Sequence, residues 1–312
     1  MKKALIAFAV ITVVGILSVV GGIAMLVSGG ISIDTIKDIE IEGIPVISVG
    51  NKTIEVDETK SQSINGIENI MLKNCACQVN IAACESDEVT VALTGKAVIE
   101  ENKDINLKVD KKGSELVIEI DSPSINSLED LFSLDFLSSG SYTDLCMTIA
   151  IPKDYIGGLE IVNMAGELDC KLADCTLSEV KTENCAGELN ITLSDTGYID
   201  FESDNCAGEI YISGGFSDIE CNNTAGEIKI TVANDTVESV ELDNTAGEIA
   251  VYVPKDIKGS VNVKNCLGGF INDFGIKSDE ILDYKGEING GGNFEFSATN
   301  TVGEISLLEN AA

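Results

Sequence analysis

The chain of 312 residues contains no histidine, no arginine and no tryptophan. Histidine is the commonest general base and metal ligand in proteins, so its absence argues against the usual catalytic and metal-binding constellations. Arginine grips phosphate groups with two parallel hydrogen bonds, and here all 20 positive residues are lysine, against 52 acidic residues. The resulting net charge of −32 repels a phosphate backbone, which excludes nucleic acid as a partner.

The sequence also lacks the short motifs that identify many enzymes. It has no P-loop, no dinucleotide-binding fingerprint, no nucleophile elbow and no Cys-x-x-Cys pair. We therefore identify no catalytic residue, no cofactor-binding residue and no small-molecule substrate, and we expect a protein that is not an enzyme.

What the sequence does contain is a six-residue word that occurs eight times in its second half. Asn (once Asp) stands first, Gly fourth and an apolar residue sixth. The first copy is Asn163-Met164-Ala165-Gly166-Glu167-Leu168, and later copies open at Asn184, Asn205, Asn223, Asn244, Asn265, Asp283 and Asn300. Self-similarity with a period of about 20 residues is the signature of a solenoid, in which each repeat forms one coil stacked on the last. The sequence therefore predicts an all-β solenoid.

The apolar positions around each copy indicate how a coil turns. Val240 and Leu242 precede Asn244 by four and two residues, and side chains two apart share one face of a strand. After the word, Ile249 and Val251 form the apolar set, so the alternation slips by one residue, and glycine tolerates such a corner. We expect buried amides that hydrogen-bond along the stack. The buried column comprises Asn163, Asn184, Asn205, Asn223, Asn244 and Asn265, and the corner column comprises Gly166, Gly187, Gly208, Gly226, Gly247 and Gly268.

Glu follows the glycine in seven of the eight copies, the exception being Gly269. Five of these carboxylates belong to consecutive copies: Glu167, Glu188, Glu209, Glu227 and Glu248. Stacked coils would bring them into one line, with neighbours about 4.8 Å apart. Two interpretations remain open, a solvated face and a binding site for divalent cations such as Ca²⁺. No other cofactor is indicated.

The N-terminal region carries the clearest indication of where the protein sits. The stretch from Ala4 to Val27 is uncharged and mostly apolar, and it follows Lys2 and Lys3. At about 1.5 Å per residue it reaches roughly 36 Å, enough to cross a hydrocarbon core of about 30 Å. A cleaved signal peptide is the alternative, although its apolar region is usually only about 7–15 residues long. The positive-inside rule then predicts a single-pass membrane protein with a cytoplasmic N-terminus and an extracytoplasmic β domain.

The chain divides into four segments: the cytoplasmic start and membrane anchor at 1–28, an extended linker at 29–66, N-terminal β coils at 67–150, and regular solenoid repeats at 151–312. The alternation breaks over 122–143, which we interpret as an insertion that covers the solenoid's own flank; a partner or membrane contact is the alternative. The last coil ends at Leu307 and Leu308 with no cap after it. We therefore predict an open C-terminal coil that self-associates or docks a protein partner.

Ten cysteines in an exported domain would ordinarily suggest disulfides. However, Cys75, Cys185, Cys206 and Cys266 occupy a slot that other copies fill with Met or Thr, which indicates a packing position. We expect mostly free thiols. The alternative is a disulfide between Cys185 and Cys206, because stacking of neighbouring coils would bring their Cα atoms into range.

A longer phrase carries a family resemblance. The strand Met147–Lys153 ends in Ile-Pro-Lys and is followed by Leu159-Glu160-Ile161 and Gly166-Glu167-Leu168. Val251–Lys255 repeats this ending as Val-Pro-Lys. This pattern resembles the toastrack-type β-strand-repeat family of unknown function, which includes candidate adhesins and Lia-type envelope-stress membrane proteins. The resemblance covers roughly 65–308. It implies a single-stranded, right-handed β-helix displayed at the cell envelope, and it transfers no catalytic residue.

Three functions are compatible with these observations. The first is a membrane-anchored, non-enzymatic surface domain that acts as an adhesin-like or envelope-stress accessory protein. The second is a divalent-cation-binding module built on the Glu column. The third is a β-helix enzyme acting on polysaccharides, which is disfavoured because a glycosidase needs two carboxyl groups flanking one bond and the 52 acidic residues single out no pair.

Overall fold

The computed structural model describes residues 51–75, 77–100, 104–121, 144–183, 185–280 and 282–310. These residues form strands and turns, and none of them belongs to a helix long and apolar enough to span a bilayer. The predicted anchor Ala4–Val27 and the predicted insertion 122–143 lie outside the described residues.

Nineteen strands make up the described fold. The first nine are β1 (Asn51–Ser63), β2 (Asn69–Cys75), β3 (Gln78–Cys84), β4 (Glu88–Glu100), β5 (Asn106–Lys112), β6 (Glu115–Asp121), β7 (Cys146–Pro152), β8 (Gly158–Leu172) and β9 (Glu179–Glu183). The others are β10 (Ala186–Leu193), β11 (Ile199–Gly214), β12 (Phe216–Val232), β13 (Ser239–Val253), β14 (Gly259–Leu267), β15 (Phe270–Asn272), β16 (Ser278–Glu280), β17 (Asp283–Ile288), β18 (Phe294–Val302) and β19 (Ile305–Glu309).

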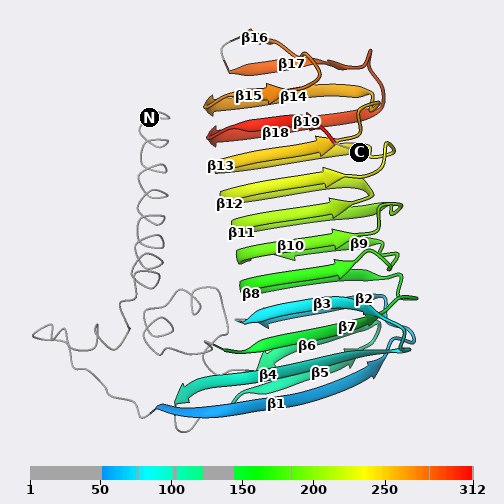
Figure 1. The fold of residues 1–312 in the computed structure, drawn as a ribbon, viewed down its shortest axis with the longest axis vertical. Helices are drawn as coiled ribbons and strands as arrows, with labels where there is room; N and C mark the ends of the chain where they lie inside the picture. Colours follow the sequence, from blue (N-terminus) through cyan, green and yellow to red (C-terminus); the bar gives the residue numbers. More distant parts are fainter. Residues whose placement is uncertain are drawn as a thin grey trace, which may run out of the picture. The chain divides into compact units, whose positions relative to one another are not determined.

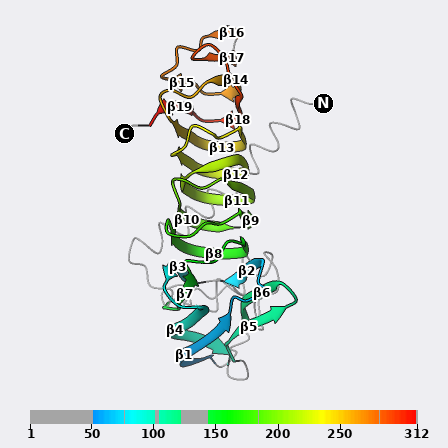
Figure 2. The same ribbon diagram turned by 90° about the vertical axis from the view of Figure 1, so that its right-hand side faces the viewer.

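The strands lie in two stacks that meet along one corner (Figures 1 and 2). The first stack has the order β5, β6, β2, β8, β9, β11, β12, β13, β18, β14, β17, β16. The second has the order β1, β4, β7, β3, β8, β10, β11, β12, β13, β19, β15. The long strands β8, β11, β12 and β13 turn the corner and belong to both. The predicted all-β solenoid is confirmed.

The core fills the space between the two stacks. Val240 and Leu242 on one side, and Ile249 and Val251 on the other, are all less than 2% exposed, which agrees with the predicted alternation. The turns between coils close the remaining side, where residues such as Val237 are buried as well. Burial of apolar area inside such a stack is the main source of its stability.

The glycine column forms the corner. Gly208 has a φ of 133°, a backbone conformation that L side chains rarely adopt, and a Cβ atom built on it would lie 2.0 Å from the carbonyl oxygen of Gly187. Apart from Gly166, which faces Cys77, each glycine of the column is pressed against the glycine of a neighbouring coil. In β8, β11, β12 and β13 the strand continues through this glycine, so the corner there is a bend within a strand. At Gly268 and Gly303 the corner instead separates two strands.

The residue that points inward just before the corner changes along the stack. In the lower coils it is the sulfur-bearing second residue of the word, since Met164 and Cys185 are 1% and 2% exposed. In the upper coils it is the Asn, since Asn223 is 5% exposed and Thr224 is exposed. The pairing of β11 with β12 shifts register here, which sets Cys206 opposite Asn223.

This change of the inward-pointing residue affects the predicted Asn column. Asn223, Asn244 and Asn265 are buried, as is Asn300. Asn184, together with the side chains of Asn163 and Asn205, lies outside the described residues. Those three residues belong to copies in which Met or Cys follows the Asn.

The hydrogen bonds of the buried amides correct the predicted ladder. Asn300 donates from Nδ2 to the carbonyl oxygen of Gly247 at 2.9 Å, and Asn265 donates to that of Gly303 at 2.8 Å. Each amide therefore bonds to the glycine corner of the neighbouring coil and not to the neighbouring amide. Both polar atoms of Asn223 and of Asn244 lack a partner among the described residues.

The coils do not follow the order of the chain at the C-terminal end. β18 pairs with β13 on one side and β14 on the other, so that Asn300 lies between Asn244 and Asn265. β19 likewise lies between β13 and β15, and Leu307 is fully buried. The predicted open coil at Leu307 and Leu308 is therefore wrong, because the last coil is intercalated between two others (Figure 1).

The word that opens at Asp283 does not form a parallel coil. It lies in β17, which runs antiparallel to β14 and pairs Gly286 with Val261. Its glycine lacks the positive φ of the corner glycines. β17 and the short β16 therefore cover the upper edge of the first stack.

At the other end, antiparallel strands close the solenoid. β1 pairs with β4 from Asn51–Glu100 to Ser63–Glu88, and β5 forms a hairpin with β6. The predicted linker 29–66 thus differs from the structure in its second half, which contributes a complete edge strand. Polar strands at this end cover the first coil, as terminal repeats of a solenoid must.

Eight cysteines have described side chains, and all eight are free thiols. Burial raises the pKa of Cys77 to about 12 and that of Cys175 to about 11. Cys185 is one of these free thiols, so the alternative disulfide between Cys185 and Cys206 is wrong.

Candidate interaction surfaces

The predicted Glu column exists as a line on the outer side of the second stack. Strand register sets Glu188 beside Glu167 and Glu209, and sets Glu227 beside Glu209 and Glu248. Four of the five side chains are exposed, and Glu227 is half-buried.

Ca²⁺ takes six to eight oxygen ligands at about 2.3–2.6 Å. A row with the spacing of stacked strands offers an ion two neighbouring carboxylates at a time. Within the described part of the chain, no three acidic or thiol side chains gather in a way that could hold a metal ion. Ca²⁺ binding by the column therefore stays a prediction, in which water or other groups would supply the remaining oxygen ligands.

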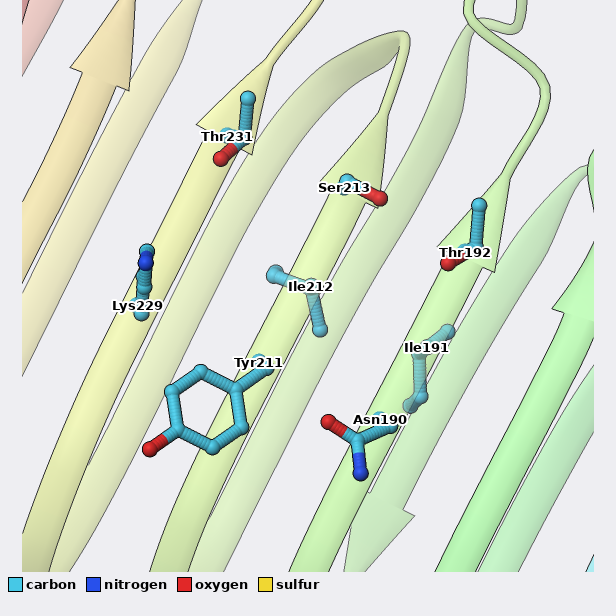
Figure 3. Close-up of a pocket in the computed structure, with 8 residues that line it drawn as sticks. All are labelled: Asn190, Ile191, Thr192, Tyr211, Ile212, Ser213, Lys229 and Thr231. Atoms are coloured by element: carbon cyan, nitrogen blue, oxygen red, sulfur yellow. The ribbon is translucent and has the colours of Figure 1, made fainter.

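Two residues beyond each glutamate, the same strands carry a second row, and a third row follows. The three rows on β10, β11 and β12 define what we call the tyrosine face: Glu188, Glu209 and Glu227; Asn190, Tyr211 and Lys229; Thr192, Ser213 and Thr231. A shallow hollow of about 190 Å³ lies between the second and third rows. Figure 3 shows the three hydroxyl side chains across neighbouring strands, with Tyr211 between Asn190 and Lys229.

The glutamates hold the other polar side chains of this face in place. Tyr211 donates its hydroxyl to Glu209 at 2.8 Å and lies 3.4 Å from Glu227. Asn190 donates to Glu188 at 2.8 Å. The hydrogen bond to Glu209 raises the pKa of the Tyr211 phenol, since the carboxylate disfavours a second negative charge beside it.

A second aromatic ring borders this face. The Lys229 ammonium lies 5.6 Å from the centre of the Tyr252 ring, within range of a cation–π attraction. The lysine is thus positioned between two tyrosines on adjacent strands, because register places it beside Tyr211 as well.

The outer side of the first stack is more acidic, and the repeated word gave no sign of it. On β9, β11, β12 and β13, the outward positions carry nine carboxylates and one lysine. We call this the acidic face: Glu179, Lys181, Glu183, Asp200, Glu202, Asp204, Asp218, Glu220, Glu241 and Asp243. The signal was present in the alternation, since these residues fall between the buried positions that the sequence identified.

Lys181 shows how a positive charge is bound on the acidic face. Its ammonium lies 3.0 Å from a carboxylate oxygen of Glu179 and 3.0 Å from one of Glu202. Hydrogen bonds to these two carboxylates raise the pKa of Lys181. In the same column of the next coils stand Glu220 and Glu241, which have no lysine beside them in register.

A groove of about 380 Å³ crosses the corners of β12, β13 and β18. Its lining is polar: Asn222, Asn223, Thr224, Asp243, Asn244, Thr245, Thr299 and Thr301. The alternation turns the amides of Asn223 and Asn244 toward the interior, so their unpartnered atoms belong to the core beneath the groove.

No family model matches the chain, and no curated protein matches it. Among solved structures, it is similar to a candidate cell adhesion protein from Clostridium sporogenes, with 17% identity and a TM-score of 0.35 over 82% of this chain and 100% of that one. It is also similar to a candidate adhesin from Bacteroides fragilis (11%, TM-score 0.25, 83% and 98% covered) and to one from Parabacteroides merdae (14%, TM-score 0.19, 82% and 97% covered). These likenesses are distant, and the solenoid described above rests on its own strand register.

Proposed function

We propose that this chain is a non-enzymatic, adhesin-like interaction protein of the cell envelope, with an accessory role in the response to envelope stress. In this proposal Ala4–Val27 is a transmembrane anchor with a cytoplasmic N-terminus, and the β domain, a right-handed solenoid, stands outside the membrane. The solenoid presents the acidic face to a cationic partner, such as a lysine-rich peptide or protein segment.

The acidic face is the observation that carries this proposal. Nine carboxylates and one lysine lie on four adjacent strands, and the strands are held rigid by pairing on both sides. A surface of one sign raises the local concentration of oppositely charged partners and speeds their association. The bonds from Lys181 to Glu179 and Glu202 are the pattern that an external ammonium would reproduce at Glu220 and Glu241.

The arrangement favours binding over catalysis. Carboxylates recur at every coil with the same spacing, and the side chains of the Glu column, the tyrosine face and the acidic face are exposed or half-buried on the outer sides of the sheet. A catalytic carboxylate pair would instead be distinguished from its neighbours by burial or by an unusual environment. Regular repetition suits an extended partner that contacts several coils at once.

The first experiment tests the location. Protease added to intact protoplasts should digest the β domain and leave a fragment that contains the first 30 or so residues. Full protection of the β domain on intact protoplasts, with digestion after lysis, would contradict the extracytoplasmic placement.

The second experiment tests the acidic face. Fluorescent poly-L-lysine is titrated with the full chain in detergent micelles, and the salt concentration is varied. The triple variant Glu202→Gln, Glu220→Gln, Glu241→Gln should lower the affinity by about tenfold or more, because it removes three adjacent charges. The control Glu167→Gln, Glu188→Gln, Glu248→Gln removes the same net charge from the other stack and should have a much smaller effect. Equal losses would mean that net charge alone attracts the probe, which contradicts a dedicated face.

The alignment of the Glu column in register favours one alternative function, a divalent-cation-binding module. Its test is the melting temperature with and without Ca²⁺. A rise in the unmodified chain that is absent from the variant Glu188→Gln, Glu209→Gln, Glu227→Gln would support it, and identical melting temperatures with and without Ca²⁺ would dismiss it.

A further inference from the structure

The tyrosine face carries a feature that a merely solvated sheet surface does not need, an aromatic ring tied down by hydrogen bonds. The Tyr211 hydroxyl is held by Glu209 at 2.8 Å. In Figure 3, which looks onto the outside of the sheet, the Tyr211 ring presents its broad face to the viewer. A ring already fixed in this way loses little conformational freedom when a ligand covers it.

The surroundings of the ring define the ligand's chemistry. The hollow beside Tyr211 is bordered by the hydroxyls of Thr192, Ser213 and Thr231 and by the amide of Asn190. Hydroxyl and amide groups donate and accept hydrogen bonds, whereas the ring face offers apolar contact. A matching ligand has one apolar face and a rim of hydroxyl groups, and this is the chemistry of a pyranose ring.

The charges on both sides of the hollow select for a ligand without net charge. The row of Glu188, Glu209 and Glu227 repels an anionic sugar. Lys229 stands beside Tyr211 in register, with its ammonium 5.6 Å from the centre of the Tyr252 ring, so this face already carries one cation that disfavours a second beside it. Carboxylates and an ammonium remain good partners for neutral hydroxyl groups, because hydrogen bonds to ionised groups are stronger than those between neutral groups.

We propose that the hollow beside Tyr211 binds one residue of a neutral saccharide chain, with the sugar's apolar face on the Tyr211 ring and its hydroxyl groups on Asn190, Ser213 and Thr231. The site lies on the opposite stack from the acidic face and does not depend on a cationic partner. Neighbouring coils repeat the carboxylate row, whereas the tyrosine, amide and lysine of the second row occur together only on β10, β11 and β12 among the described strands of this stack. A single sugar position is therefore expected.

The test uses the full chain in micelles of a detergent without a sugar headgroup, so that the detergent does not compete. Neutral hexasaccharides of glucose, mannose and N-acetylglucosamine are examined by saturation-transfer NMR and by calorimetry, next to hexagalacturonate and tetramethylammonium chloride. At least one neutral hexasaccharide should bind, and hexagalacturonate should bind about tenfold more weakly or not at all.

Three variants locate the site. Tyr211→Ala should weaken binding of the neutral hexasaccharide by about tenfold or more, and Ser213→Leu should do the same by filling the hollow while leaving the ring in place. Tyr211→Phe keeps the ring without its tether and should give a smaller loss. The matched control is Tyr198→Ala, which removes another tyrosine, 65% exposed, from the turn before β11 and should leave the affinity unchanged. Melting curves verify that each variant is folded.

Three outcomes would overturn the proposal. The first is no binding of any neutral hexasaccharide. The second is binding that Tyr211→Ala and Ser213→Leu leave unchanged, since the sugar would then lie elsewhere. The third is a Tyr211-dependent response to tetramethylammonium alone, which would identify a cation site instead. None of these outcomes bears on the acidic face, whose test uses a different probe and different variants.

Discussion

The Nδ2 atom of Asn300 donates a hydrogen bond to the carbonyl oxygen of Gly247, 2.9 Å away, although 53 residues separate them along the chain. The bond joins the coil of β18 to the coil of β13, and the corresponding bond from Asn265 to Gly303 joins the next coil to it. The corner of the upper solenoid is thus stabilised by amide side chains that reach across coils to glycine carbonyls.

This relationship predicts different effects for two asparagines of the same column. Asn300→Ala should lower the free energy of unfolding by about 1–3 kcal/mol, because the variant loses a buried hydrogen bond. Asn244→Ala removes an equally large side chain that has no hydrogen-bond partner among the described residues, and its cost should stay within about 1 kcal/mol. Denaturant unfolding of both variants measures the difference. Equal losses would show that Asn244 finds a partner in solution.

The glycine corner predicts a large effect from a single methyl group. Gly208→Ala places a Cβ atom 2.0 Å from the Gly187 carbonyl oxygen on a backbone with φ of 133°, so it should cost about 3 kcal/mol or more. The control is Gly269→Ala, because a Cβ atom there has no heavy atom within 4 Å and the φ is not positive. Thermal melting distinguishes the two, and a stable Gly208→Ala protein would mean that the coils separate more easily than the register indicates.

The intercalated coil predicts that Leu307 behaves as a core residue. Leu307→Asp introduces a carboxylate at a fully buried position and should destabilise by about 3–5 kcal/mol. Leu267→Asp changes a leucine that is 65% exposed and should shift stability by less than about 0.5 kcal/mol. Should Leu307→Asp melt like the unmodified chain, the coil of β18 and β19 would not lie between its two neighbours.

The burial of Cys77 should make the free energy of unfolding depend on pH in the alkaline range. Its pKa is raised from the ordinary value near 9 to about 12, first by burial and then by the nearby Cys146. The folded state therefore holds this proton more tightly than the unfolded state does. The contribution to stability is complete below pH 9 and is lost as the pH rises toward 12. Between these values the free energy of unfolding of Cys77→Ala should fall less steeply than that of the unmodified chain, and parallel curves would contradict the assignment.

Much of the fold could be predicted from the sequence, because the repeated word states the local geometry directly. The alternation around Asn244 identified the buried positions Val240, Leu242, Ile249 and Val251, and it marked the glycine as the corner. Each of these follows from side chains within a few residues of one another. Local rules of this kind need no knowledge of which coil comes next.

The order of the last coils could not be predicted, for the same reason. In the structure, the word that opens at Asn300 stacks on the word that opens at Asn244. The word that opens at Asn265 could stack there equally well, because both words offer Asn, Gly and apolar residues at the same positions. The choice depends on which coil best covers the apolar side chains of its neighbour. The apolar β18 side chains Phe294 and Phe296 are both buried by the intercalation.

The surfaces were only partly predictable. The Glu column belongs to the repeated word and was identified, whereas Tyr211 and Lys229 occur at a position that varies from coil to coil. The acidic face was missed because its residues, such as Glu202 and Glu220, lie outside the word, on a face that becomes visible only when the strands are aligned. The side chains that form each surface come from several neighbouring coils, so the sequence of a single repeat does not reveal the surface.

The intercalated coil also determines the order in which the strands can join the solenoid during folding. A chain that emerges with its N-terminal part first can add β8 to β13 to the growing rod one coil after another as it crosses the membrane. β14 must wait, because its place in the rod is beside β18, and the described strands show no pairing between β13 and β14. Residues 254–293 are therefore synthesised before the surface that receives them exists. Assembly of β14 to β19 is expected only after the whole chain has been made, so the exposed edge of β13 is the point at which a chaperone, or an unwanted strand from another molecule, has time to act.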